Sequence, residues 1–98
     1  MTASELRATA HSDSAPPSEL SDELRALWLA AADRWHEAHD LCQDLPDPAG
    51  AWIHAYLHRV EGDLGNAGYW YHRAGRQAPP AGVSLDQEWD TLATEFGS

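Results

Sequence analysis

Apolar residues recur with helical spacing along most of this 98-residue chain. Between residues 18 and 32 the apolar positions step by four, three and four, which places on one helical face Leu20, Leu24, Leu27 and Ala31. Trp28 lies at the edge of that face. A serine at position 18 or 21 can cap this helix, and acidic residues in its first turn oppose the positive end of the helix dipole.

Four more segments show the same rhythm, and the predicted helices span residues 34–44, 49–61, 64–74 and 85–96. Prolines and glycines separate them, because neither residue continues a helix well. The stripe predicted for 34–44 holds Trp35, Ala38, Cys42 and Leu45. The third helix buries Ile53, Leu57 and Val60, extended by Trp52 and Tyr56. The fourth buries Leu64, Ala67, Trp70, Tyr71 and Ala74.

The two ends of the chain differ in pattern. Residues 1–17 are rich in alanine, serine, threonine and proline and end in Pro16-Pro17, which predicts a disordered tail. Ser84 with Gln87 three positions later forms a capping-box pattern ahead of the last helix, which has one apolar stripe and an acidic outer face. We therefore expect a single α-helical domain over residues 18–98.

A shift of 29 positions aligns one predicted hairpin with the next. It pairs Ala26-Leu27-Trp28 with Ala55-Tyr56-Leu57 and pairs Asp33, Trp35 and Ala38 with Gly62, Leu64 and Ala67. A helical hairpin has an apolar face that it cannot bury alone, so repeated hairpins stack. The predicted fold is all-α: two stacked helix-turn-helix hairpins with a C-terminal capping helix.

The second hairpin carries a resemblance to known repeats. Glu61-Gly62-Asp63, Asn66-Ala67 and Tyr69-Trp70-Tyr71-His72-Arg73-Ala74 resemble the second half of a Sel1-like or tetratricopeptide repeat. The resemblance implies a right-handed stack of helical hairpins and protein–protein interaction, although two units are fewer than such stacks normally contain. Residues 35–75 also resemble a group of small bacterial proteins that has no assigned activity.

Charge and composition limit the classes of partner and compartment. The formal net charge is −10, with no lysine, so anionic nucleic acid and anionic membrane are unsuitable partners. Residues 51–82 are the exception, with three arginines against two acids. The single cysteine, Cys42, allows no internal disulfide, and no apolar run is long enough to cross a membrane. We expect a cytoplasmic protein.

Histidines in the third predicted helix offer a metal-binding pattern. His54, His58 and Glu61 follow at i, i+4 and i+7 and share a helical face, and His39 on the preceding helix is a further candidate. Two imidazoles and a carboxylate can hold a divalent transition metal such as zinc. Alternatively, these histidines are half-buried packing residues, with His58 bonded to Glu61 or Asp40. The HExxH motif of zinc proteases is absent, because Ala55 follows His54.

The exposed sides of the third and fourth helices offer a protein-binding surface. It comprises Arg59, Tyr69, His72 and Arg73, with Trp52 and Tyr56 as either core residues or the lining of a cleft. Alternatively, the arginines only pair with surface acids. We expect a small non-enzymatic interaction module without a cofactor, a homodimer being compatible with two repeats. The alternative is a metal- or small-ligand-binding protein.

Overall fold

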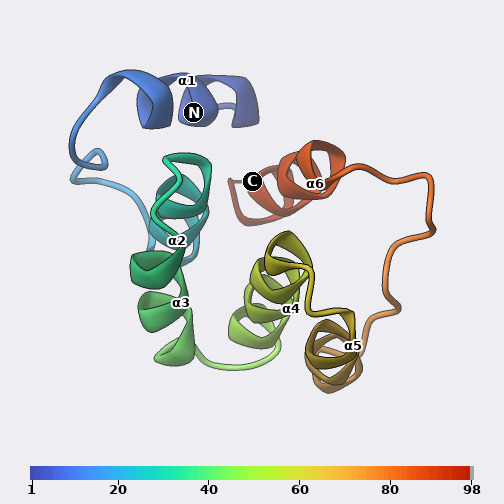
Figure 1. Ribbon diagram of the computed structural model, residues 1–98. Coiled ribbons are helices and arrows are strands. Elements are labelled where there is room, and N and C mark those ends of the chain that lie inside the picture. Colours follow the sequence, from blue (N-terminus) through green and yellow to red (C-terminus); the bar gives the residue numbers. More distant parts are fainter. Residues whose placement is uncertain (98) are drawn as a thin grey trace.

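The computed structural model describes residues 1–97, and these form six helices and no strand, which confirms the all-α prediction. Figure 1 shows the path of the chain. The helices are α1 (Ala3–Ser12), α2 (Asp22–Ala31), α3 (Trp35–Gln43), α4 (Ala49–Glu61), α5 (Leu64–Arg73) and α6 (Leu85–Gly97). The observed limits of α2 to α6 agree with the predicted ones to within a few residues, because proline, glycine and capping residues mark them.

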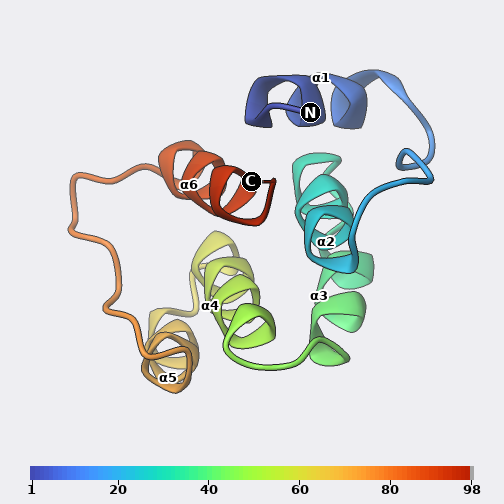
Figure 2. The same ribbon diagram turned by 180° about the vertical axis from the view of Figure 1, so that it is seen from behind.

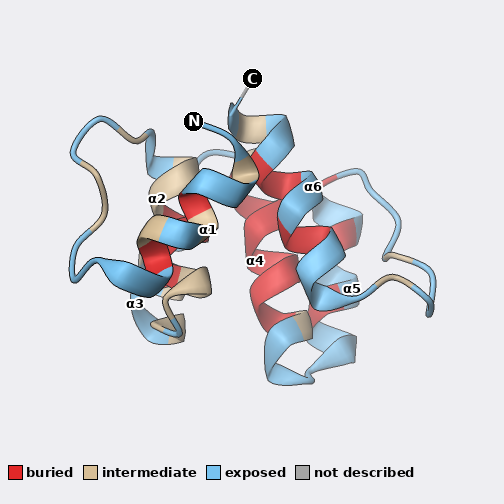
Figure 3. Ribbon diagram, turned by 90° about the horizontal axis from the view of Figure 1, so that it is seen from above, coloured by how far each residue is buried: buried red, intermediate tan, exposed pale blue. Residues whose placement is uncertain are grey.

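Neighbouring helices contact each other as hairpins, α2 with α3 and α4 with α5. The two hairpins meet where α4 packs against both α2 and α3. Figure 3 shows buried residues running along most of α4, and every residue from Gly50 to His58 is buried. Helix α4 is therefore the centre of the molecule.

The same turn joins the helices of both hairpins. Asp33 and Gly62, 29 positions apart, have left-handed backbones with φ of 62° and 86°. The residue after each donates its N–H to a carbonyl five positions back: Arg34 to Leu29 at 2.9 Å and Asp63 to His58 at 3.0 Å. Asp and Gly are among the residues that tolerate positive φ. The sequence alignment at this offset therefore corresponds to a repeated turn geometry.

Helix α5 packs mainly against α4, and its Tyr71 hydroxyl also donates a hydrogen bond to the buried Glu88 of α6. Only the side that faces α4 is covered, so Ala67, Tyr71 and Ala74 are buried as predicted. Leu64 is 68% exposed and Val60 is 40% exposed, so the prediction that these two residues belong to the core is wrong. Both residues lie near the turn, where no second layer of helices covers them.

Residues 3–12 form helix α1 rather than the disordered tail that their composition favours. Thr2 and Glu5 form a capping box at its start, and Leu6 and Ala10 are buried. Figure 2 shows α1 lying across α2 and α6, the two helices that it contacts. Trp28, predicted at an edge, is fully buried under it and donates its indole N–H to Thr9 Oγ1 at 3.0 Å. Small apolar residues, which add little to a sequence pattern, suffice once α2 and α6 supply the opposing surface.

Helix α6 begins with the predicted capping box, because Ser84 and Gln87 exchange hydrogen bonds of 2.8 and 3.0 Å. It packs on α1, α2 and α4, and its buried Glu88 accepts a hydrogen bond from the Tyr71 hydroxyl of α5. Trp89 of α6 donates its indole N–H to the carbonyl oxygen of Leu27 at 2.8 Å. The last helix thus covers the junction of the two hairpins instead of continuing the stack beyond α5.

Replacing Leu6 by alanine tests whether α1 belongs to the folded domain. The buried Leu6 side chain leaves a cavity when truncated, and we expect Leu6→Ala to lower the free energy of unfolding by about 2 to 5 kcal/mol in urea titrations. The matched control is Leu64→Ala at an exposed site, with an expected change of less than about 0.5 kcal/mol. Equal, small effects of the two substitutions would show that α1 contributes nothing to folding.

Candidate metal centre

Three histidines from two helices converge where the first hairpin meets the second. His39 comes from α3, and His54 and His58 come from successive turns of α4. One ring nitrogen of each lies within 4.8 Å of the corresponding nitrogens of the other two. The spacing i, i+4 places two of the imidazoles on one side of α4, and the contact between α3 and α4 adds the third.

The close approach of the two helices depends on Gly50. A Cβ at this position would lie 2.4 Å from the carbonyl oxygen of Leu45, so a larger residue does not fit without a shift of the backbone. Glycine therefore lets α4 begin beside the end of α3. The two helices then run close enough for His39 to face His54, with ring centroids 4.5 Å apart.

Two tryptophans hold the imidazoles from opposite ends of the cluster. The Trp35 ring stacks on His39 with centroids 4.8 Å apart, and the Trp70 ring stacks on His54 at 3.9 Å. The ring centroids of His54 and His58 are 4.9 Å apart. Stacking on large indoles limits the rotation of the His39 and His54 rings, so their nitrogens are oriented before any ligand binds.

His58 differs from the other two histidines because its ring is hydrogen-bonded. Its Nδ1 lies 2.9 Å from Oε1 of Glu61, which leaves Nε2 available. Across residues 1–97 the ring nitrogens of His39 and His54 form no hydrogen bond with the protein. In the same residues, Nε of Arg25 is the one side-chain nitrogen or oxygen that is both fully enclosed and without a hydrogen-bond partner. Because the ring nitrogens of His39 and His54 also lack a partner in the protein, they must keep some contact with solvent.

Burial keeps His39 and His54 uncharged at pH 7. His54 and His58 are only 5% and 7% exposed. Burial, followed by the neighbouring His39, His58 and Arg73, lowers the pKa of His54 to about 4. Burial, followed by the proximity of His58, also lowers the pKa of His39. Neutral imidazole is the form that binds a metal ion, so at pH 7 His39 and His54 are ready to act as ligands.

The Glu61 carboxylate does not lie within 4.8 Å of all three histidine nitrogens. Its carboxylate is bonded to His58 and remains partly exposed. The His58–Glu61 pair is the one expected if these histidines serve only for packing. The same arrangement also lets a carboxylate orient a histidine that binds a metal ion. Asp63, which we did not predict as a site residue, lies close by with its ligand oxygen within 4.8 Å of His58 and Glu61. In the sequence, the Glu61-Gly62-Asp63 turn was the signal that could have identified Asp63, because a glycine with a left-handed backbone brings the residue after it back toward the helix.

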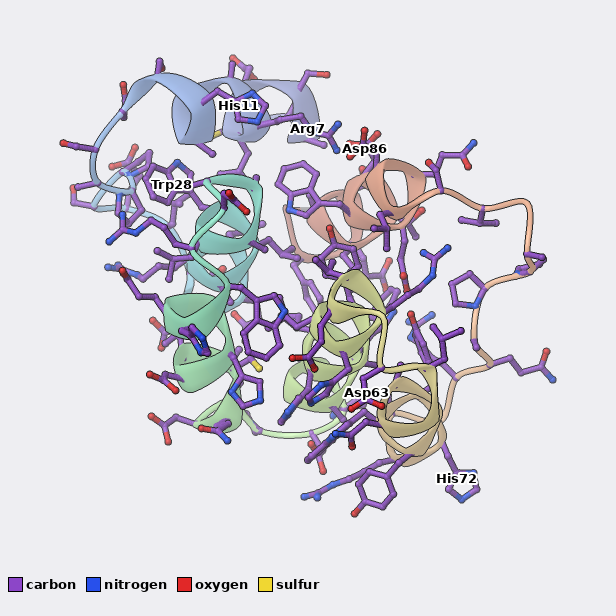
Figure 4. The ribbon with its side chains drawn as sticks, in the orientation of Figure 1. Arg7, His11, Trp28, Asp63, His72 and Asp86 are labelled. Atoms are coloured by element: carbon purple, nitrogen blue, oxygen red, sulfur yellow. The ribbon has the colours of Figure 1, made fainter. Side chains whose placement is uncertain are left out.

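The predicted protein-binding residues do not form one surface. Tyr69 is 57% exposed, and Figure 4 shows His72 pointing away from the helices into solvent. Arg73 is half-exposed, pairs with Asp47 at 2.8 Å and lies 4.9 Å above the Trp70 ring. These residues remain candidates for partner contact.

Arg59, Trp52 and Tyr56 lie elsewhere. The expectation that Arg59 projects from an exposed side is wrong, because it is largely covered and pairs with the buried Glu88 of α6 at 2.9 Å. Trp52 and Tyr56 are buried and belong to the core, which was one of the two roles considered for them. The folding of α6 back over α4 covers all three residues, and nothing in the local sequence pattern indicates that path.

An open cavity of about 290 Å³ adjoins the cluster through His54. Trp70, Arg73 and Cys42 are among its lining residues. Burial, and then the nearby Asp40, raises the pKa of the Cys42 thiol to about 12, so this sulfur stays protonated and is a poor nucleophile or ligand. The imidazoles are therefore the available metal ligands in this region.

Comparison with protein-family models, curated proteins and solved structures finds no match to this chain. No helix of the described residues combines the length and the apolar character needed to cross a bilayer. The function is therefore inferred from the site alone.

The stability of the metal-free protein should depend on pH through His54. Its pKa is about 4 in the folded chain and about 6.5 in an unfolded one. Between these values the unfolded chain binds a proton that the folded chain does not, so the free energy of unfolding falls as the pH falls. We expect a loss of about 2 kcal/mol between pH 7.5 and 5 in urea titrations with a chelator present. The lowered pKa of His39 acts in the same direction.

The variant His54→Gln should show a shallower pH dependence than the unsubstituted chain over that range. The control is His72→Ala, which removes an exposed histidine and should leave the dependence unchanged. An identical pH profile with and without His54 would contradict the assignment of a depressed pKa to this residue.

Proposed function

We propose that this protein binds a divalent transition metal ion through His39, His54 and His58. The observation that carries the proposal is the convergence of three imidazole nitrogens within 4.8 Å, two of which belong to rings without a hydrogen bond to residues 1–97. Imidazole suits zinc, copper and nickel, and three histidines leave a further coordination position for water or another ligand.

The environment of the histidines favours ligation over simple packing. Buried polar groups are normally hydrogen-bonded, and a histidine used only for packing usually finds a carbonyl or a carboxylate. His58 has such a partner in Glu61, and this bond would also hold Nε2 toward the other two rings. His39 and His54 have no such partner in residues 1–97 and their ring nitrogens keep contact with solvent, so a cation can bind them in place of water.

The charge of the chain also favours a cation. Sixteen acidic residues against six arginines give a formal net charge of −10 at pH 7. Such a protein attracts divalent cations over distances set by the ionic strength. Within the cluster His39 and His54 are neutral donors, whereas Arg73, which lies on the Trp70 ring, places a positive charge near His54. Arg73 therefore opposes a dication locally, while the net negative charge of the chain favours one.

Zinc should stabilise the folded protein, because an ion that binds only the native chain raises its unfolding free energy. At a free zinc concentration of about 100 times the dissociation constant the gain is about 2.7 kcal/mol. For a domain of this size that gain raises Tm by on the order of 10 °C in a thermal scan at pH 7. His39→Gln and His54→Gln should each abolish most of the shift.

The control for this experiment is His72→Ala, which removes an exposed histidine on α5 and should keep the full shift. Each variant is first measured without metal, so that a change in intrinsic stability is separated from a change in metal binding. The absence of a Tm shift with zinc, copper and nickel would rule out the proposal.

A second candidate function is protein–protein interaction at the outer side of α5. Tyr69 is 57% exposed and packs edge-on against Trp70, and Arg73 lies beside both. Exposed tyrosine beside arginine is typical of interfaces. The resemblance of this hairpin to Sel1-like and tetratricopeptide repeats supports the same role, as does the hairpin contact of α4 with α5.

Substituting both Tyr69 and Arg73 by alanine tests the second candidate. Both side chains are exposed, so the fold should persist, while a partner that binds there should lose at least about 2 kcal/mol of affinity. The measurement is quantitative affinity capture, with Ser12→Ala plus Asp13→Ala at the end of α1 as the control pair. Equal capture of the same partners by both double variants would contradict this role.

A further inference from the structure

We propose that His58 belongs to two metal positions and that a second divalent cation binds between its Nδ1, Glu61 and Asp63. This inference rests on the proposed function of the three-histidine cluster, with which the second position shares His58. One ligand atom from each of His58, Glu61 and Asp63 lies within 4.8 Å of the other two. Figure 4 shows Asp63 beside the junction of α4 and α5.

The turn between α4 and α5 builds this second position. Gly62 has a left-handed backbone, and the N–H of Asp63 donates to the carbonyl oxygen of His58 at 3.0 Å. The chain therefore folds back so that the residue after the glycine lies over the last turn of α4. Glu61 reaches the same place from that last turn, three positions after His58.

The carboxylates at this position are open to an ion. The residues Glu61 and Asp63 are exposed, while His58 is buried, so the position has a solvent-facing side and an anchored side. Asp63 caps α5, but its bonds to the backbone and side-chain nitrogens of Asn66 are long, at 3.3 and 3.4 Å. Asp63 therefore keeps lone pairs that can approach a cation, and Glu61, whose Oε1 is bonded to His58, has its other carboxylate oxygen for the same purpose.

The first hairpin shows that the turn itself does not require these ligands. Its turn has the same left-handed residue and the same hydrogen bond five positions back. At the positions equivalent to His58, Glu61 and Asp63, which lie 29 residues earlier, it carries Leu29, Ala32 and Arg34. A hydrophobic, a small and a basic residue are thus compatible with the same turn geometry. The set of one imidazole and two carboxylates is particular to the turn beside the three-histidine cluster.

The chemistry of imidazole allows one ring to serve two cations. If the first ion were held by Nε2 of His58, the remaining donor atom of the ring would be Nδ1, which faces Glu61. A second Zn²⁺ then takes the lone pair of Nδ1, and the proton on that nitrogen leaves to the buffer, so that His58 becomes a bridging imidazolate. The two carboxylates and the imidazolate offset the added positive charge, and nitrogen with oxygen donors suits zinc.

The test is the number of Zn²⁺ ions bound per chain, measured by equilibrium dialysis with metal analysis and by native mass spectrometry. The unsubstituted protein should bind two, the second at least tenfold more weakly and with release of one proton. The double variant Glu61→Gln plus Asp63→Asn should bind one. Glutamine keeps a hydrogen-bond partner for His58, and asparagine keeps a good cap for α5, so the fold is retained.

A copper titration supplies an independent readout. Two Cu²⁺ ions bridged by one imidazolate are magnetically coupled, so the electron paramagnetic resonance signal of the doubly loaded protein should integrate to clearly less than two spins. The singly loaded protein, and the double variant at saturation, should integrate to one.

The outcomes separate this inference from the proposed function. One zinc ion in the unsubstituted chain, lost in His54→Gln, would overturn the second position and leave the three-histidine site intact. Two ions that persist in the double variant would also overturn it, because the second ion then binds elsewhere. No bound zinc at all would overturn both proposals.

Discussion

The burial of α4 on nearly every side is the constraint on which the rest of the structure depends. Helices α2, α3, α5 and α6 all pack against it, and every residue from Gly50 to His58 is buried. A histidine in such a helix resists protonation, and the pKa of His54 falls to about 4 for that reason. The same packing presses His39 of α3 against the two imidazoles of α4. The burial that makes the core thus also creates a set of neutral nitrogen donors.

A metal ion at this position would join the two hairpins directly. His39 belongs to the first hairpin, whereas His54 and His58 belong to the second. The remaining links between the halves are apolar packing, the Trp35 indole N–H donated to the carbonyl oxygen of Leu57 at 2.7 Å, and helix α6 across the junction. With only two hairpins, each has a single neighbour to stabilise it. Coordination across the junction would therefore strengthen the single contact that each hairpin makes with the other.

The sequence predicts the individual helices better than the way they pack. Helical periodicity, Gly62, Gly75 and the Ser84 capping box placed five of the six helices. The pattern could not place α1, whose buried residues are Leu6 and Ala10. It also could not show that α6 returns over α4 and covers Arg59. The spacing of His54 and His58 shows that they share a helical face. The sequence does not show that His39, Trp35 and Trp70 reach these two histidines. Their contact depends on how close α3 and α5 come to α4.

The most direct test of the account is X-ray absorption spectroscopy at the zinc edge on the protein loaded with one equivalent of Zn²⁺. We expect a first shell dominated by nitrogen at about 2.0–2.1 Å, with the multiple-scattering pattern of three imidazoles and one oxygen ligand such as water. A first shell of oxygen alone, or one containing sulfur from Cys42, would contradict the assignment of His39, His54 and His58 as the ligands.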